Sequence, residues 1–136
     1  MIKEIVTDNF FLSQKAKPAT KEDQAVIQDL KDTLKAHRHH CVGMAANMIG
    51  INKAIIIVAM GPLDLVMVNP EITSQAKPYQ TQEGCLSHTG QKPTQRYQEI
   101  QVQYLDEHFH PKNRRFQGPL AQVIQHEMDH LAGILI

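Results

Sequence analysis

The chain has 136 residues, of which 42% are hydrophobic and 21% charged, and this size and composition predict a single domain over residues 1–136. Its formal net charge is zero, which removes the usual reason to expect electrostatic capture of nucleic acid or of an anionic membrane. Two cysteines are too few for a disulfide framework, and the sequence has neither a signal peptide nor an apolar run approaching the ~20 residues of a membrane span, so we expect a cytoplasmic protein.

The first predicted element is an amphipathic helix within residues 20–38. Thr20 is a typical N-cap residue, and the acidic Glu22 and Asp23 follow it in the first turn, where the helix dipole favours negative charge. Apolar residues recur along the segment at helical spacing and should form its buried face: Val26, Ile27, Leu30 and Leu34.

The middle of the chain is rich in predicted strands. Residues 53–60 form a continuous apolar run of strand length, which is typical of a buried strand. Residues 63–72 form a second run, which we expect to end at Asn69-Pro70 because this dipeptide is a turn signal.

A third strand is predicted over residues 97–106, where apolar and polar residues alternate. This period of two places Ile100, Val102 and Tyr104 on the buried face. A turn should then lead to a short strand around Arg115-Phe116.

The final predicted element is a helix that begins near Gly118, with Pro119 suited to its first turn. The order is one N-terminal amphipathic helix, several mostly antiparallel strands and a C-terminal helix. This order predicts an α+β fold rather than alternating β-α-β units.

The C-terminal helix contains an H-E-x-x-H sequence at residues 126–130. His126 and His130 share one helix face, so both imidazoles can bind one metal ion, with Glu127 beside them as a general base. The alternative is a chance arrangement on an exposed helix. Apolar neighbours indicate a buried helix instead, in which two histidines and a glutamate need partners.

Six residues follow His130, so a third ligand is expected from upstream. Cys85 is favoured because Gly84 lets the backbone approach a metal closely, and a Cys-His-His set leaves one position open for catalysis. The candidates considered are Cys41, Cys85, His88, His108 and His110.

Three segments together resemble the signature motifs of the peptide deformylase family: VGMAAN at 42–47, EGCLS at 83–87 and QHEMDH at 125–130. The likeness covers most of the chain. It implies a metal-dependent hydrolase that removes the N-formyl group from formyl-methionine of nascent bacterial polypeptides. An N-formylated peptide is then the partner, with transient proximity to the ribosome and with no specific nucleic acid or membrane.

The resemblance also implies a role for each residue of the metal centre. Cys85, His126 and His130 would bind the metal, commonly Fe(II), with Zn, Ni or Co able to substitute. Glu127 would be the acid/base that handles the proton of the metal-bound water.

The same resemblance implies how substrate binds, as an added strand with an apolar pocket for the methionine side chain. Gly43, Glu83 and Gly84 match positions that meet the substrate backbone. Gln122 and Val123 share the face of His126 and are expected to line the pocket. All five residues are therefore predicted to bind substrate.

Arg96 has two interpretations. It pairs with Glu83 and braces the metal-binding loop, or it is a solvated surface residue.

The first motif departs from the family pattern at two positions. Cys41 stands where the family has a glycine, and Met48 stands where it has the glutamine whose amide helps hold the oxyanion. The remaining expected donor is the backbone N–H of Leu86, and Asn47 is a substitute donor only if the backbone is re-routed. Two further hypotheses therefore remain beside a working deformylase: a related enzyme with weak or altered amidase activity, and a non-catalytic metal- or peptide-binding protein.

Overall fold

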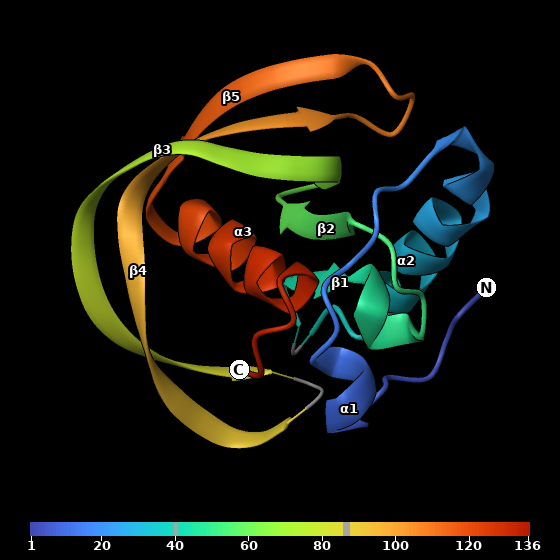
Figure 1. Ribbon diagram of the computed structural model, residues 1–136, viewed down its shortest axis with the longest axis horizontal. Coiled ribbons are helices and arrows are strands. Elements are labelled where there is room, and N and C mark those ends of the chain that lie inside the picture. The colour runs from blue at the N-terminus through green and yellow to red at the C-terminus, as the bar shows by residue number, and fades with distance from the viewer. Residues whose placement is uncertain (40, 86–87) are drawn as a thin grey trace.

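The computed structural model describes residues 1–39, 41–85 and 88–136. In this part of the chain an antiparallel sheet of five strands, in the order β1-β2-β3-β4-β5, bends around the C-terminal helix (Figure 1). The helices are α1 (Asn9–Leu12), α2 (Gln24–Ala36) and α3 (Gly118–Leu131), with short 3-10 turns η1 (Lys21–Asp23) and η2 (Ala46–Ile49). The strands are β1 (Gly43–Ala45), β2 (Ile55–Met60), β3 (Leu63–Cys85), β4 (His88–Leu105) and β5 (Pro111–Gln117). The predicted α+β fold is confirmed.

The predicted N-terminal helix is α2, preceded by η1. Thr20 caps η1 as expected: its side chain accepts from the Glu22 N–H, while its own N–H donates to the Asp23 carboxylate at 2.8 Å. This reciprocal arrangement is a capping box. The apolar face is buried as predicted, at Val26, Ile27, Leu30 and Leu34.

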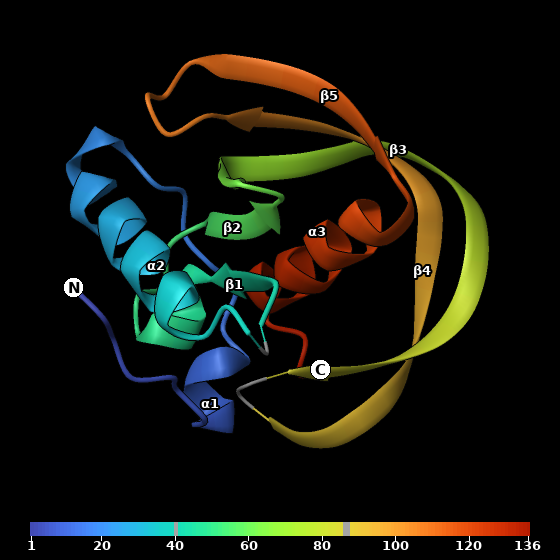
Figure 2. The ribbon, with the colours of Figure 1, turned by 180° about the vertical axis from the view of Figure 1, so that it is seen from behind.

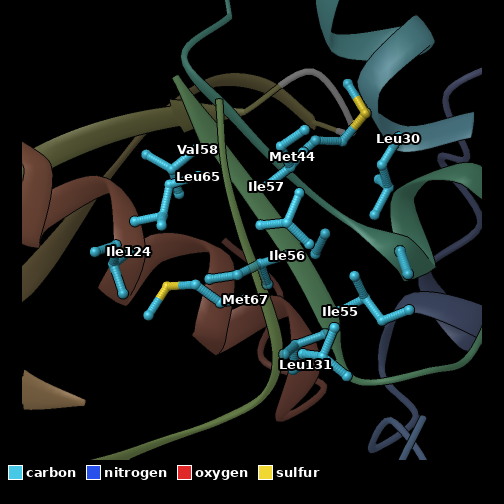
Figure 3. Close-up of a cluster of buried hydrophobic side chains, with 14 of the residues drawn as sticks. Leu30, Met44, Ile55, Ile56, Ile57, Val58, Leu65, Met67, Ile124 and Leu131 are labelled. Atoms are coloured by element: carbon cyan, nitrogen blue, oxygen red, sulfur yellow. The ribbon is translucent and has the colours of Figure 1, made fainter. Parts of the chain in front are cut away.

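Strand β2 forms the centre of the hydrophobic core. It lies between α2 and α3, as both views of the ribbon show (Figures 1 and 2). Four consecutive residues of β2 are fully buried because both faces of the strand are covered. In Figure 3, Leu30 of α2 and Ile124 of α3 lie on opposite sides of the strand. The continuous apolar run in the sequence was therefore a correct signal for a doubly covered strand.

The predicted end of the next strand at Asn69-Pro70 is wrong, because β3 continues to Cys85. The pairing with β4 shifts register between Val68 and Glu71, and Asn69 adopts a positive φ of 50°. Asn69 also exchanges two side-chain hydrogen bonds with the backbone of Ala19. The dipeptide is therefore a bulge, a place where a proline costs no ladder hydrogen bond.

The long β3–β4 ribbon curls around α3 (Figures 1 and 2) and brings Glu83 and Cys85 to that helix. Its last part includes the predicted strand over 97–106, in which Ile100, Val102 and Tyr104 are buried as expected. The earlier part of β4 was not predicted, because its residues are mostly polar and exposed.

The closing elements agree with expectation. The strand predicted around Arg115-Phe116 is β5, and α3 has Pro119 in its first turn. The polar residues of the H-E-x-x-H sequence lie on the buried side of α3, at His126, Glu127 and His130. No helix in the described part of the chain is long and apolar enough to cross a membrane.

Candidate metal centre and cleft

Three ligand-type side chains meet where the end of β3 reaches α3. The ligand atoms of Cys85, His126 and His130 all lie within 4.8 Å of one another. The Cys85 Sγ is 3.2 Å from His130 Nε2, and the two imidazole centroids are 5.0 Å apart. The helical spacing of the histidines and the curl of the ribbon together create this convergence.

The other upstream candidates are placed differently. His108 and His110 lie in the exposed turn between β4 and β5, with their ring centroids 6.1 Å apart. Cys41 lines the same cavity as Cys85 but does not belong to the three-residue group. The side chain of His88 is outside the described part of the structure. Cys85 is thus the candidate that the fold brings to the two histidines.

This donor set fits a divalent transition metal. One thiolate and two imidazoles are typical ligands of zinc or iron, and three protein ligands would leave one coordination position open. Burial lowers the pKa of His126, but hydrogen bonds with Cys85 and Glu83 outweigh it and raise the pKa to about 10. The thiol of Cys85 and the carboxylate of Glu83 therefore stabilise positive charge at this ring.

Glu83 anchors the first histidine. Its Oε1 lies 2.8 Å from His126 Nδ1, which leaves Nε2 of that ring as the nitrogen available to a metal. Gln122 Nε2 donates to the other carboxylate oxygen at 2.9 Å. Burial raises the pKa of Glu83, but hydrogen bonds from His126, Arg96 and Gln122 dominate and lower it to about 2. Glu83 is a buried, ionised carboxylate that orients the ligand.

Arg96 completes this anchor from β4. Its Nε and Nη2 donate to both oxygens of Glu83 at 3.0 and 2.7 Å, and its Nη1 donates to Asp129 at 2.6 Å. The side chain is buried, so the paired interpretation of Arg96 is confirmed and the solvated one is wrong. Asp129 was not predicted as a second partner, because the contact joins β4 to the last turn of α3.

Gln125 is a positioning residue that sequence reasoning missed. Its side-chain amide accepts from Tyr97 N–H at 2.8 Å and donates to Tyr97 C=O at 2.7 Å, as a neighbouring strand would. The glutamine therefore holds β4 against α3 one residue before His126. The side chain is buried and its amide needs partners, but no pattern in the sequence pointed to Tyr97 as that partner.

A cavity of about 580 Å³ opens beside the group of Cys85, His126 and His130, which we call the metal-type group. All five residues predicted to bind substrate line it: Gly43, Glu83, Gly84, Gln122 and Val123. Cys41 and Met48 line it as well, together with residues that sequence reasoning missed: Val42, Gln82, Gly90 and Gln91.

Glu127 and Gly43 are packed together in the cavity wall. A Cβ on Gly43 would come within 2.7 Å of Val123 Cγ1 and 3.0 Å of Glu127 Oε2, so only glycine lets β1 pass this close. Burial raises the pKa of Glu127 to about 7, although the charge on His126 opposes the shift. In the described part of the chain Glu127 Oε1 has no hydrogen-bond partner.

Three residues of the first and second motifs bear on how the oxyanion is held: Met48, Asn47 and Leu86. Met48 is buried in η2, and its Sδ accepts from the Ala45 N–H at 3.4 Å. Asn47 Nδ2 donates to the carbonyl of His130 at 2.8 Å and does not line the cavity, so nothing supports Asn47 as the substitute donor. Leu86 lies outside the described residues.

Known proteins match this chain along its whole length. A sequence model of the family described as "Polypeptide deformylase" matches residues 2–136. "Peptide deformylase" of Clostridium beijerinckii is 54% identical over 136 residues, which are 100% of both chains. The crystal structure of a peptide deformylase from Legionella pneumophila is similar with a TM-score of 0.90 and 32% identity, over 99% of this chain and 83% of that one. The Met-Ala-Ser-bound structure of a class I type b peptide deformylase from Acinetobacter baumannii has a TM-score of 0.89 and 29% identity, over 99% and 97%.

Proposed function

The chain belongs to the peptide deformylase family, enzymes that remove the N-formyl group from nascent polypeptides, and on this premise we propose which of its residues carry each part of the reaction. The whole machinery lies in one domain over residues 1–136. The observation that carries the proposal is the convergence of Cys85, His126 and His130 beside Glu127, in the wall of one cavity.

We propose that Cys85, His126 and His130 hold the metal ion, with Fe(II) as the native metal. Two observations support this assignment. The three ligand atoms lie close together, and the Nδ1 of His126 is hydrogen-bonded to Glu83, which leaves its Nε2 for the metal. A bound metal ion polarises water and the formyl oxygen, and so supplies a nucleophile and a Lewis acid at neutral pH. A thiolate among the ligands suits a softer metal than a carboxylate would.

Glu127 is the proton carrier in this proposal. Its carboxylate accepts a proton from the attacking water and then delivers a proton to the amine that leaves, so that formate and a free amino terminus are the products. A pKa of about 7 supports this role, because such a group gives and takes protons at neutral pH with little energetic cost. Its Oε1 has no competing partner in the described structure.

The peptide binds along β1 with its first side chain in the cavity. Gly43 offers backbone groups at the edge of the sheet, while Val123 and Gln122 on α3 line the pocket for the methionine. Glu83 and Gly84, at the end of β3, line the same cleft. The tripeptide-bound relative from Acinetobacter baumannii supports a peptide as the ligand of this cleft. A substrate emerging from synthesis further suggests a cytoplasmic enzyme that works in transient proximity to the ribosome.

Met48 favours a second candidate, a related enzyme with slow or altered amidase activity. A thioether cannot donate a hydrogen bond, so Met48 gives no amide N–H to the oxyanion. The metal centre is unaffected by this change, because Met48 is not part of it. A deformylase with a weakened oxyanion site is therefore compatible with the same geometry.

One assay separates these candidates. Protein loaded anaerobically with Fe(II) is given formyl-Met-Ala-Ala and acetyl-Met-Ala-Ala at matched concentrations, with metal-free protein as the control. Strong preference for the formyl peptide supports the proposed function. Comparable or preferred hydrolysis of the acetyl peptide would favour the altered amidase, and absence of turnover on both at full metal occupancy would contradict the proposal.

A further inference from the structure

The edge strand β1 presents backbone groups to the cleft. The Val42 carbonyl accepts from the Ala59 N–H at 2.8 Å, and the register places Gly43 opposite Val58. Hydrogen-bonded and non-bonded pairs alternate along an antiparallel ladder, so the N–H and C=O of Gly43 point away from β2. Within the described sheet no further strand lies on that side, and Gly43 lines the cavity.

The Gly43 carbonyl already has a partner, the thiol of Cys41. The Cys41 Sγ donates to it at a distance of 3.0 Å. Burial raises the pKa of Cys41 to about 11. The sulfur therefore keeps its proton at neutral pH and remains a donor. Cys41 itself lines the cavity, so the thiol covers the acceptor from the substrate side.

We propose that Cys41 is a specificity-determining residue whose thiol occupies the Gly43 carbonyl and weakens the backbone pairing of peptides along β1. The proposal rests on the proposed function, in which a peptide occupies this cleft. A thiol is a weak donor, so an amide N–H of the peptide can displace it, but that hydrogen bond is then exchanged rather than gained.

The effect should appear in binding and not in the chemical step. We expect the carbonyl to pair with the peptide backbone about equally strongly in the ground state and in the transition state. A change in such a bond alters KM and leaves kcat unchanged. With one backbone bond weakened, the side chain of the first residue contributes a larger share of the affinity.

The test compares Cys41→Ala, which removes the donor, with Cys41→Ser, which keeps a donor of similar size. The dissociation constant of the unformylated peptide Met-Ala-Ala-Ala is measured by calorimetry on Fe(II)-loaded protein, next to KM and kcat for its formylated form. We expect Cys41→Ala to bind about three- to tenfold more tightly, the worth of one neutral hydrogen bond, with kcat unchanged. Cys41→Ser should stay near the wild type. Equal tightening in both variants, or no tightening in Cys41→Ala, would overturn the proposal.

Peptides that are N-methylated at one amide nitrogen at a time locate the gain. Methylating the nitrogen that pairs with the Gly43 carbonyl should make the dissociation constants of Cys41→Ala and the wild type equal. The loss of affinity should therefore be larger in Cys41→Ala than in the wild type. An advantage that survives every methylation would mean that the thiol acts through volume alone. Melting temperatures of the variants verify that each is folded.

These measurements keep the two proposals apart. Calorimetry with an unformylated peptide needs no turnover, so it reports on Cys41 even if no formyl group is removed. If the dissociation constants follow the expected pattern but the protein has no deformylase activity, only the proposed function is wrong. If deformylase activity is normal but the wild type and the Cys41 variants have identical dissociation constants, only the inference about Cys41 is wrong.

Discussion

The two walls of the cleft are built from different chemistry. The wall formed by β3, β4 and α3 is held by charged hydrogen bonds: Arg96 joins Glu83 to Asp129, and Glu83 holds His126. The wall formed by β1 and η2 has no such ion pairs among the described residues: backbone pairing with β2, the bond from Asn47 to the His130 carbonyl and packing hold it. It also carries two sulfur contacts, from Cys41 to the Gly43 carbonyl and from the Ala45 N–H to Met48. We call these the charged wall and the sulfur wall.

The difference shows which part of the site tolerates change. In the charged wall each carboxylate oxygen of Glu83 serves two partners, so a substitution of Arg96 leaves a buried charge unpaired. The sulfur wall loses only weak contacts when it changes, and both departures from the family pattern lie in it. The metal centre is therefore expected to be the robust part of the site, and substrate handling the variable part.

The largest expected effect is at the metal-binding end of the charged wall. Cys85→Ala should lose most of the bound metal and with it nearly all turnover, because two histidines remain as ligands. Cys41→Ala is the matched control, since it removes a thiol from the same cavity and should keep the metal. Elemental analysis after gel filtration measures both. Stoichiometric metal in Cys85→Ala would show that the ligand assignment is wrong.

Glu127 comes next: it reaches from α3 toward Gly43 of the sulfur wall, and it does not belong to the group of Cys85, His126 and His130. Glu127→Gln should retain the metal and the fold while kcat falls by about 10² to 10⁴, the usual contribution of a general acid/base. Steady-state kinetics at matched metal occupancy give this number. Turnover close to that of the wild type would assign Glu127 a purely structural role.

Arg96 tests whether the charged wall acts as one unit. Arg96→Met should cost about 3–5 kcal/mol in the free energy of unfolding, because the carboxylate of Glu83 loses its charged partner inside the protein. Metal should also dissociate faster, since Glu83 orients His126. Denaturant unfolding and transfer of the metal to a chelator report the two effects. Arg115→Met is a suitable control, as the exposed pair of Arg115 with Glu99 should contribute little.

Sequence reasoning reached the metal-type group because its signals are local. The spacing of His126 and His130 fixes a helix face, and the glycine beside Cys85 marks a close approach. The doubly covered β2 and the alternating end of β4 were local patterns as well. These parts of the fold and of the site follow from residues that are near one another in the chain.

The parts that escaped prediction depend on contacts between distant segments. The far part of the β3–β4 ribbon, up to Cys85 and from His88, has no apolar alternation because most of its described residues are exposed. Its curl depends on packing around α3, which lies far along the chain. The Asn69-Pro70 bulge follows from side-chain bonds to Ala19, fifty residues away. Asp129 and Gln125 find their partners on β4. No spacing rule within the chain indicates such pairs.

The smallest expected effect belongs to the sulfur wall, at Met48. In η2 the residue Ala45 is the N-cap and Met48 occupies N3, where its sulfur accepts from the Ala45 N–H. A glutamine at N3 accepts from the same N–H in a capping box. In Met48→Gln the Oε1 should take over this contact, which leaves the amide N–H₂ to donate into the cavity that Met48 lines.

We therefore expect Met48→Gln to raise kcat on formyl-Met-Ala-Ala by about tenfold or more, on the order of 1.4 kcal/mol. The gain should appear in kcat rather than in KM, because the new donor acts on charge that develops in the transition state. Met48→Leu is the control: it keeps the packing, loses the sulfur acceptor and adds no donor, so kcat should not rise. A wild type that is already fast, with kcat unchanged in Met48→Gln, would show that another group already stabilises the oxyanion. The sulfur wall would then differ in composition from the same wall in related enzymes, without a difference in catalytic rate.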